Sequence, residues 1–214
     1  MEISKTKRMC ILIASIVLIS LITFSARFIN AISVLPVKIA LKILLNILMG
    51  VVAIVAMKLT KIKTEFGLKN VKSYVIGIVI ALGLTLVMGL IPIWCGTSLI
   101  GGHSDFVLWE FIFNLFYLLL IIGPVEELIF RVYIQETIEV YFNKNKWISV
   151  IIAAVLFGIF HIINGSIGQV IFTFIIGLVF GLCKYFIKNC KYLGVALGHG
   201  LYDFLIYVLT IVAL

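Results

Sequence analysis

The amino-acid sequence predicts an all-α fold, a polytopic bundle of about seven membrane-spanning helices with a cytoplasmic N-terminus. Of its 214 residues, 64% are hydrophobic and 12% are charged, whereas a soluble domain is nearer to about half apolar and about a quarter charged. The apolar runs are long and lack the strict alternation of barrel strands, so helices are expected. Lys and Arg gather in alternate loops, as the positive-inside rule describes.

The first predicted span, residues 9–24, follows a basic N-terminal stretch. Its apolar run exceeds the signal-peptide core of about 7–15 residues, so we expect a span that is not cleaved. The other apolar runs cover residues 39–57, 73–94, 106–142, 147–163, 167–187 and 192–214. Between them we expect a Gly-rich loop at 95–105 and short turns at 143–146 and 164–166.

The fourth run, residues 106–142, is too long for one straight span. Pro124 lies inside it, so this helix must tilt, protrude or bend at the proline. An alternative arrangement has eight spans, with the part after Pro124 crossing the bilayer separately. That arrangement places Lys184, Lys188 and Lys191 outside, and the positive-inside rule disfavours it.

The positive-inside rule accounts for the net charge of +8, because it favours Lys and Arg in cytoplasmic loops. With seven spans and the N-terminus inside, only Arg27, Lys38 and Lys42 of the 17 basic residues remain outside. The sequence has no basic patch with interleaved aromatic residues, so no nucleic-acid partner is expected. The partner that the composition does imply is the lipid bilayer.

No linker or soluble segment interrupts the chain, so residues 1–214 are predicted to form a single integral membrane domain. Residues 1–105 hold N-terminal spans without a recognisable signature, and residues 118–208 hold the motifs of a candidate core. The four cysteines form no C-x-x-C pair, so they are expected to be small apolar residues rather than a disulfide framework or a zinc site.

The stretch Glu126-Glu127-Leu-Ile-Phe-Arg131 places three ionisable groups beside a long apolar run. Glu127 and Arg131 are four residues apart, with the acid first, so they can pair on one helix face. Glu126 points about 100° away and need not share that pair. A carboxylate held where water is scarce can serve as a general base near neutral pH. The alternative is a plain ion pair at the membrane boundary.

Two further motifs lie on later spans. His161 follows Phe157 by four residues, and His199 precedes Asp203 by four. Asp203 can therefore accept a hydrogen bond from one imidazole nitrogen and fix the tautomer of His199.

Helix geometry predicts that these groups lie at membrane depth. At the α-helical rise, Glu126 lies roughly 24 Å from Phe142, and His161 lies roughly 21 Å from Trp147. Because residues 143–146 join these helices at one membrane face, the carboxylate and the imidazole are expected at similar height. Ionisable groups within a bilayer are expensive and usually functional, so the pattern predicts a site.

The motifs EELIFR (Glu126 to Arg131), FGIFH (Phe157 to His161) and HGLYD (His199 to Asp203), in this order on separate membrane helices, resemble those of the CAAX prenyl endopeptidase and bacteriocin-processing family. This family is also called abortive-infection-type or CPBP intramembrane proteases. The resemblance covers about residues 118–208. It implies an intramembrane endopeptidase that cleaves a membrane-embedded or lipidated peptide or protein.

The resemblance also implies roles for the residues. Glu126 would activate the attacking water, and His161 would hold that water or a metal. His199 and Asp203 would complete the polar site and stabilise the oxyanion. A glutamate base with His support needs no metal.

The same resemblance implies that Glu127 and Arg131 form a supporting pair. A zinc ion held by Glu126, His161 and His199 is the metalloprotease alternative, although the sequence lacks H-E-x-x-H.

The third motif carries Asp203 where eukaryotic prenyl proteases carry Asn, which points to a bacterial-type member in the cell membrane. For such a member a leader peptide or a lipidated peptide is as plausible a substrate as a prenylated CAAX protein. Two other functions stay open: a non-catalytic bacteriocin self-immunity protein with the family's fold, and a proton-coupled transporter. Buried carboxylates and histidines also suit a proton relay, but the sequence shows no inverted repeat with matching broken helices.

Overall fold

The computed structural model describes residues 3–96, 103–163 and 166–212. Throughout this part of the chain the regular structure is helical and no strand occurs, as predicted. Seven helices are long and apolar enough to cross a membrane: Lys5–Asn30, Leu35–Thr60, Val71–Trp94, Leu108–Tyr141, Lys146–Ile163, Ile167–Phe186 and Tyr192–Val212. Most of the expected Gly-rich loop and part of the 164–166 turn lie outside the described residues.

The chain divides into two compact units, and each is described by itself. The first unit comprises Met1–Glu65 and Val125–Ile187, and the second comprises Phe66–Pro124 and Lys188–Leu214. Each unit therefore combines N-terminal spans with part of the segment that carries the motifs.

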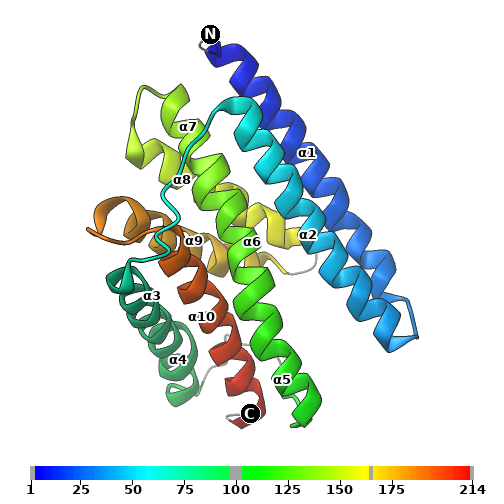
Figure 1. Ribbon diagram of the computed structural model, residues 1–214. Helices are drawn as coiled ribbons and strands as arrows, with labels where there is room; N and C mark the ends of the chain where they lie inside the picture. The colour runs from blue at the N-terminus through cyan, green and yellow to red at the C-terminus, as the bar shows by residue number, and fades with distance from the viewer. Residues whose placement is uncertain (1–2, 97–102, 164–165, 213–214) are drawn as a thin grey trace. The chain divides into compact units, whose positions relative to one another are not determined.

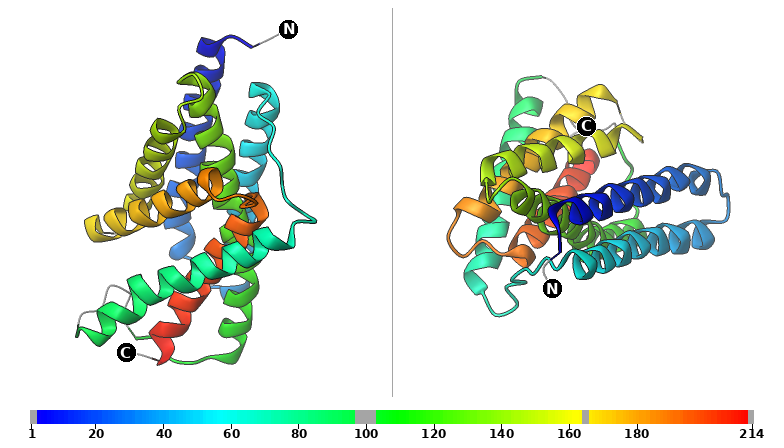
Figure 2. Two further views of the ribbon diagram at one scale, coloured as in Figure 1. Left: turned by 90° about the vertical axis from the view of Figure 1, so that its left-hand side faces the viewer. Right: turned by 90° about the horizontal axis from the view of Figure 1, so that it is seen from above.

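Helices α1 (Lys5–Asn30) and α2 (Leu35–Thr60) run side by side in the first unit (Figures 1 and 2). The Ser4 hydroxyl accepts from the Lys7 amide at the start of α1. Pro36 sits in the first turn of α2, where its missing N–H removes no helical bond. Lys61, in the left-handed region at φ 56°, ends α2.

The helix with the acidic motif alternates α-helical and π-helical turns. Its consecutive parts are α5 (Leu108–Tyr117), η2 (Leu118–Ile122), α6 (Gly123–Glu127), η3 (Leu128–Ile134) and α7 (Gln135–Tyr141). Pro124 donates no amide hydrogen and lies two residues after the π-helical η2, which shifts the helical ladder. The helix continues without a break through Pro124, so the described residues form seven candidate spans rather than eight.

The first unit is completed by α8 (Lys146–Phe160), the single 3₁₀ turn η4 (His161–Ile163) and α9 (Ile167–Phe186). Small residues bring α8 and α9 together. A Cβ built on Gly177 would lie 3.3 Å from the Cα of Ala154 and 3.1 Å from the Phe157 ring. A side chain at Gly177 would therefore need its neighbours on α8 to shift slightly.

In the second unit α10 (Tyr192–Val212) packs directly on α3 (Val71–Leu84) and on η2. The backbones almost touch: a Cβ on Gly77 would lie 2.0 Å from the Gly194 carbonyl oxygen, and a Cβ on Gly123 would lie 2.6 Å from the Gly200 nitrogen. The remaining parts of this unit are η1 (Thr85–Leu90) and α4 (Ile91–Trp94).

Large apolar side chains cover the outside of the helices. Leu21, Leu44 and Val79 have exposed fractions of 62%, 56% and 63%. An apolar surface spread along whole helices is stable facing lipid and unfavourable in water. Together with the seven apolar helices, this surface identifies an integral membrane protein.

Candidate functional site

Glu127, the second glutamate of the motif, forms a buried ion pair with Arg131. Nε of Arg131 lies 3.2 Å from Oε2 of Glu127, and both side chains are almost completely inaccessible to solvent. The structure therefore contains the pair that the four-residue spacing predicts. Glu126, in contrast, is only partly buried, so the two adjacent carboxylates have different surroundings.

Arg131 is held on more than one side. Its guanidinium lies over the ring of Phe157 at 4.6 Å, a cation–π contact between η3 and α8. Among the described residues, its terminal nitrogens Nη1 and Nη2 have no hydrogen-bond partner. Glu127 and the aromatic ring contact this charge directly and Glu126 adds electrostatic attraction, so loss of Glu127 would leave it poorly compensated.

A second buried polar group supports the same π-helical segment. Nζ of Lys184, on α9, donates to the backbone carbonyl of Arg131 at 2.8 Å and forms an ion pair with Glu136. The Thr64 hydroxyl donates to the same Glu136 carboxylate at 3.1 Å. A π turn shifts the helical ladder, so a carbonyl in it benefits from an outside donor.

Lys184 lies within the predicted span 167–187, and its spacing in the sequence points to no partner on another helix. In the structure the Lys184 side chain is only 7% exposed. A lysine within an apolar helix was the available signal, since a buried cation needs a partner.

The tautomer of His161 follows from its contacts. Its Nδ1 lies 2.8 Å from the carbonyl oxygen of Phe157. A carbonyl only accepts, so Nδ1 carries the hydrogen and, in the neutral ring, Nε2 is the acceptor. The Phe157 ring also packs edge-on against the imidazole, with centroids 4.7 Å apart. Phe157 thus contacts both His161 and Arg131.

Glu126 and His161 line one cavity within the first unit. Its volume is about 180 Å³, room for several water molecules. The other lining residues come from α1, α2, η3 and α8: Thr23, Met49, Ile129, Phe130 and Phe160. Two groups that are 35 positions apart in the sequence therefore share a small, mostly apolar chamber, as their calculated depth predicts.

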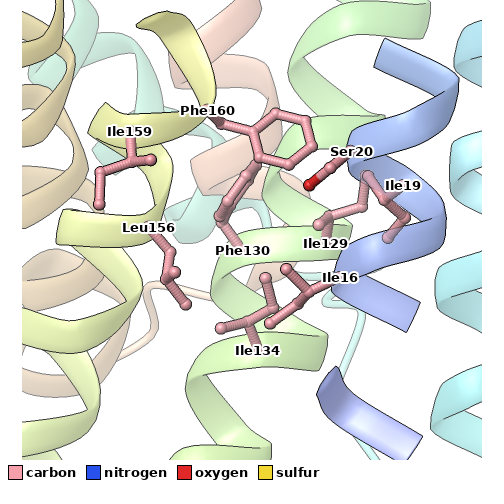
Figure 3. A pocket seen from close by; sticks show the side chains of 9 residues that line it. All are labelled: Ile16, Ile19, Ser20, Ile129, Phe130, Ile134, Leu156, Ile159 and Phe160. Carbon is pink, nitrogen blue, oxygen red and sulfur yellow. The ribbon is translucent and has the colours of Figure 1, made fainter. Parts of the chain in front are cut away.

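An apolar cavity of about 80 Å³ adjoins this chamber (Figure 3). The two cavities share Ile129, Phe130 and Phe160 in their walls. Ser20 carries the only hydroxyl among the nine side chains that Figure 3 labels. The walls come from α1, η3 and α8, and they are mainly apolar.

The third motif lies in the second unit. Nε2 of His199 lies 3.4 Å from Oδ2 of Asp203, one helical turn along α10, as the four-residue spacing predicts. The His199 side chain is 4% exposed and that of Asp203 is 28% exposed. Gly198 and Gly200 flank the histidine, and they allow α10 to pass against the backbones of α3 and η2.

The donor atoms at the chamber are of the kinds that zinc binds. Glu126 offers a carboxylate and His161 offers Nε2, because its Nδ1 already donates to a carbonyl. Within the described ranges, no group of three or more His, Cys, Asp or Glu side chains is placed to hold a metal ion. His199, the third expected ligand, belongs to the second unit.

In a comparison with protein families, residues 108–205 match the family model described as type II CAAX prenyl endopeptidase Rce1-like. The match spans just under half of the 214 residues and includes all three motifs. It begins at α5 and leaves out α1, α2 and α3. No curated protein and no solved structure matches the chain.

Proposed function

We propose that the protein is an intramembrane endopeptidase, because residues 108–205 match the family model described as type II CAAX prenyl endopeptidase Rce1-like. Its substrate is a membrane-embedded or lipidated peptide or protein. The observation that carries the proposal is the chamber shared by Glu126 and His161. A carboxylate and a neutral imidazole beside a space for water are the components of general-base hydrolysis.

In the proposed reaction, Glu126 removes one proton from a water molecule in the chamber, while Nε2 of His161 accepts a hydrogen bond from the hydrogen that stays on the water oxygen. The water oxygen forms a bond to the peptide carbonyl carbon. The C–N bond then breaks, and Glu126 returns the proton to the departing amine nitrogen. Atoms and charge balance without an added oxidant or reductant.

Glu127 and Arg131 have a structural role in this proposal. Their charges offset each other in a buried pair, and Glu126 is the carboxylate that lines the chamber. The π-helical turns after Glu127 place Arg131 against Phe157, which also contacts the ring of His161. The pair thereby supports both proposed catalytic groups.

We assign His199 and Asp203 a role in stabilising the oxyanion. Nε2 of His199 lies 3.4 Å from the Asp203 carboxylate, which can accept its hydrogen and orient the ring. Replacement of His199 by Gln should then lower turnover more than it raises the Michaelis constant.

Zinc is an alternative within this proposal, and Glu126 and Nε2 of His161 would supply two of its ligands. When bound, zinc would polarise the substrate carbonyl or the attacking water. Elemental analysis of the purified protein decides between the versions. Stoichiometric zinc that is lost in His161→Gln supports the zinc version, and its absence from active protein supports the glutamate base alone.

The experiment that tests the proposed function compares membranes from cells that express the wild type or Glu126→Gln. Mass spectrometry of labelled peptide ends should find cut ends that are present with the wild type and absent with the variant. Glu110→Gln is the matched control, since it makes the same change near the start of the same helix. Identical peptide ends in all three samples would refute an endopeptidase and favour a non-catalytic immunity protein or a transporter.

A further inference from the structure

An arginine of the first helix contacts the turn that carries His161. Nε and Nη2 of Arg27 both donate to the carbonyl oxygen of Ile163, with Nε at 2.7 Å. Ile163 is the last residue of the single turn η4, and His161 is its first. Arg27 lies outside the family match, so this contact is made by a part of the chain without family motifs.

The contact lies at the C-terminal end of η4, where helical hydrogen bonds are weakest. The last carbonyls of a helix have no partner within the helix, and a single 3₁₀ turn has poorly aligned hydrogen bonds. Arg27 supplies two donors and a positive charge at this end, where the helix dipole favours a cation. The fork of its guanidinium holds one carbonyl from two directions.

The same turn fixes the tautomer of His161. The hydrogen bond from Nδ1 to the Phe157 carbonyl spans the last turn of α8. If that turn opens, the imidazole loses the acceptor that fixes its tautomer. The Arg27 contact, two residues beyond His161, opposes this opening.

The helix that holds Arg27 also contributes to the chamber wall. Thr23 lies one helical turn before Arg27 and lines the cavity with Glu126 and His161. Its hydroxyl donates to the Ile19 carbonyl at 3.0 Å and lies 3.2 Å from the sulfur of Met49. One face of α1 therefore reaches both the chamber and the turn beside it.

We propose that Arg27 is a positioning residue for His161. By holding the Ile163 carbonyl, it keeps the His161 turn closed and the imidazole in the Nδ1–H tautomer at the chamber wall. The consequence for hydrolysis rests on the proposed function, whereas the effect on the tautomer does not. Arg27→Lys keeps the positive charge but loses the paired N–H donors, so it should hold the Ile163 carbonyl only in part. Arg27→Gln should not hold it.

The tautomer can be measured without a substrate. The chain has only three histidines, so ring ¹⁵N NMR of labelled protein in lipid nanodiscs gives few signals, which His103→Gln and His199→Gln assign. The wild type should show His161 as the Nδ1–H form. Arg27→Gln should shift its signals toward a tautomer mixture, and Arg27→Lys should shift them less.

Lys38→Gln is the matched control. Lys38 is also a cation at the ends of α1 and α2 that donates to a backbone carbonyl, that of Asn30 at 3.2 Å. It should leave the His161 signals unchanged. The His199 signals show in each Arg27 and Lys38 variant whether the fold is intact. If Arg27→Gln does not fold, the comparison is made with Arg27→Lys instead. Unchanged His161 signals in a folded Arg27→Gln protein would overturn the proposal.

Kinetics give a second readout once a cleaved peptide is known. Arg27→Gln should lower kcat about 10- to 100-fold, with KM within about twofold, because misplacing a catalytic group affects the transition state. In a His161→Gln background the same change should have no further effect. Equal losses in both backgrounds would exclude action through His161. Altered NMR signals in a protein that cleaves nothing would instead refute the proposed function alone.

Discussion

Nε of Arg131 and Oε2 of Glu127 lie 3.2 Å apart with almost no access to solvent, one residue after the proposed base. A buried ion pair depends on both of its partners, because desolvation leaves either charge uncompensated when the other is removed. This relationship explains why Glu127, although adjacent to Glu126, has a structural role and does not act as the general base.

Replacing either member of the pair should therefore destabilise the protein. Glu127→Ala and Arg131→Ala should each lower the free energy of unfolding by about 3–5 kcal/mol. Denaturant unfolding in detergent measures this, with Glu110→Ala as the control on the same helix. Full stability of both variants would show that the pair contributes nothing.

Lys184 should be coupled to Glu136. Lys184→Met removes the donor to the Arg131 carbonyl and strands a partly buried carboxylate, so we expect a loss of about 2–4 kcal/mol. Adding Glu136→Gln to that variant should restore part of the stability. Strictly additive losses in the double variant would argue against a shared interaction.

The glycines of the second unit allow a matched test of helix packing. Gly77→Ala should destabilise by about 1–3 kcal/mol, since its Cβ would lie 2.0 Å from the Gly194 carbonyl oxygen. Gly83→Ala on the same helix α3 should be neutral or slightly stabilising, because its Cβ meets nothing within 4 Å. Thermal unfolding of the two variants compares them, and equal effects would contradict this packing.

The predicted orientation places the N-terminus in the cytoplasm. In a variant with its four native cysteines replaced, Ser33→Cys between α1 and α2 should react with a membrane-impermeant maleimide in intact cells. Lys144→Cys, in the turn before α8, should react only after permeabilisation. The reverse labelling pattern would require the opposite orientation.

Much of this architecture follows from local patterns. The seven spans follow from long apolar runs, and the pairs Glu127–Arg131 and His199–Asp203 follow from four-residue spacing on a helix. The similar depth of Glu126 and His161 follows from counting residues back from a shared turn.

Other features depend on contacts that no local pattern encodes. The π-helical turns at 118–122 and 128–134 are not evident in the sequence, because their hydrophobic pattern is that of an ordinary α-helix. Lys184 finds its partner 48 residues away, and Arg27 finds its partner 136 residues away. Such pairings arise only when the helices have packed, so spacing alone does not predict them.

The role of Glu126 as general base is the central claim. Its most direct test uses purified protein and a peptide that spans the cleavage site found in membranes, and compares turnover by the wild type and Glu126→Gln. We predict a fall in kcat of at least about 100-fold at unchanged melting temperature, since the amide fills the same space but does not take up a proton. Turnover by Glu126→Gln equal to that of the wild type would contradict the assignment.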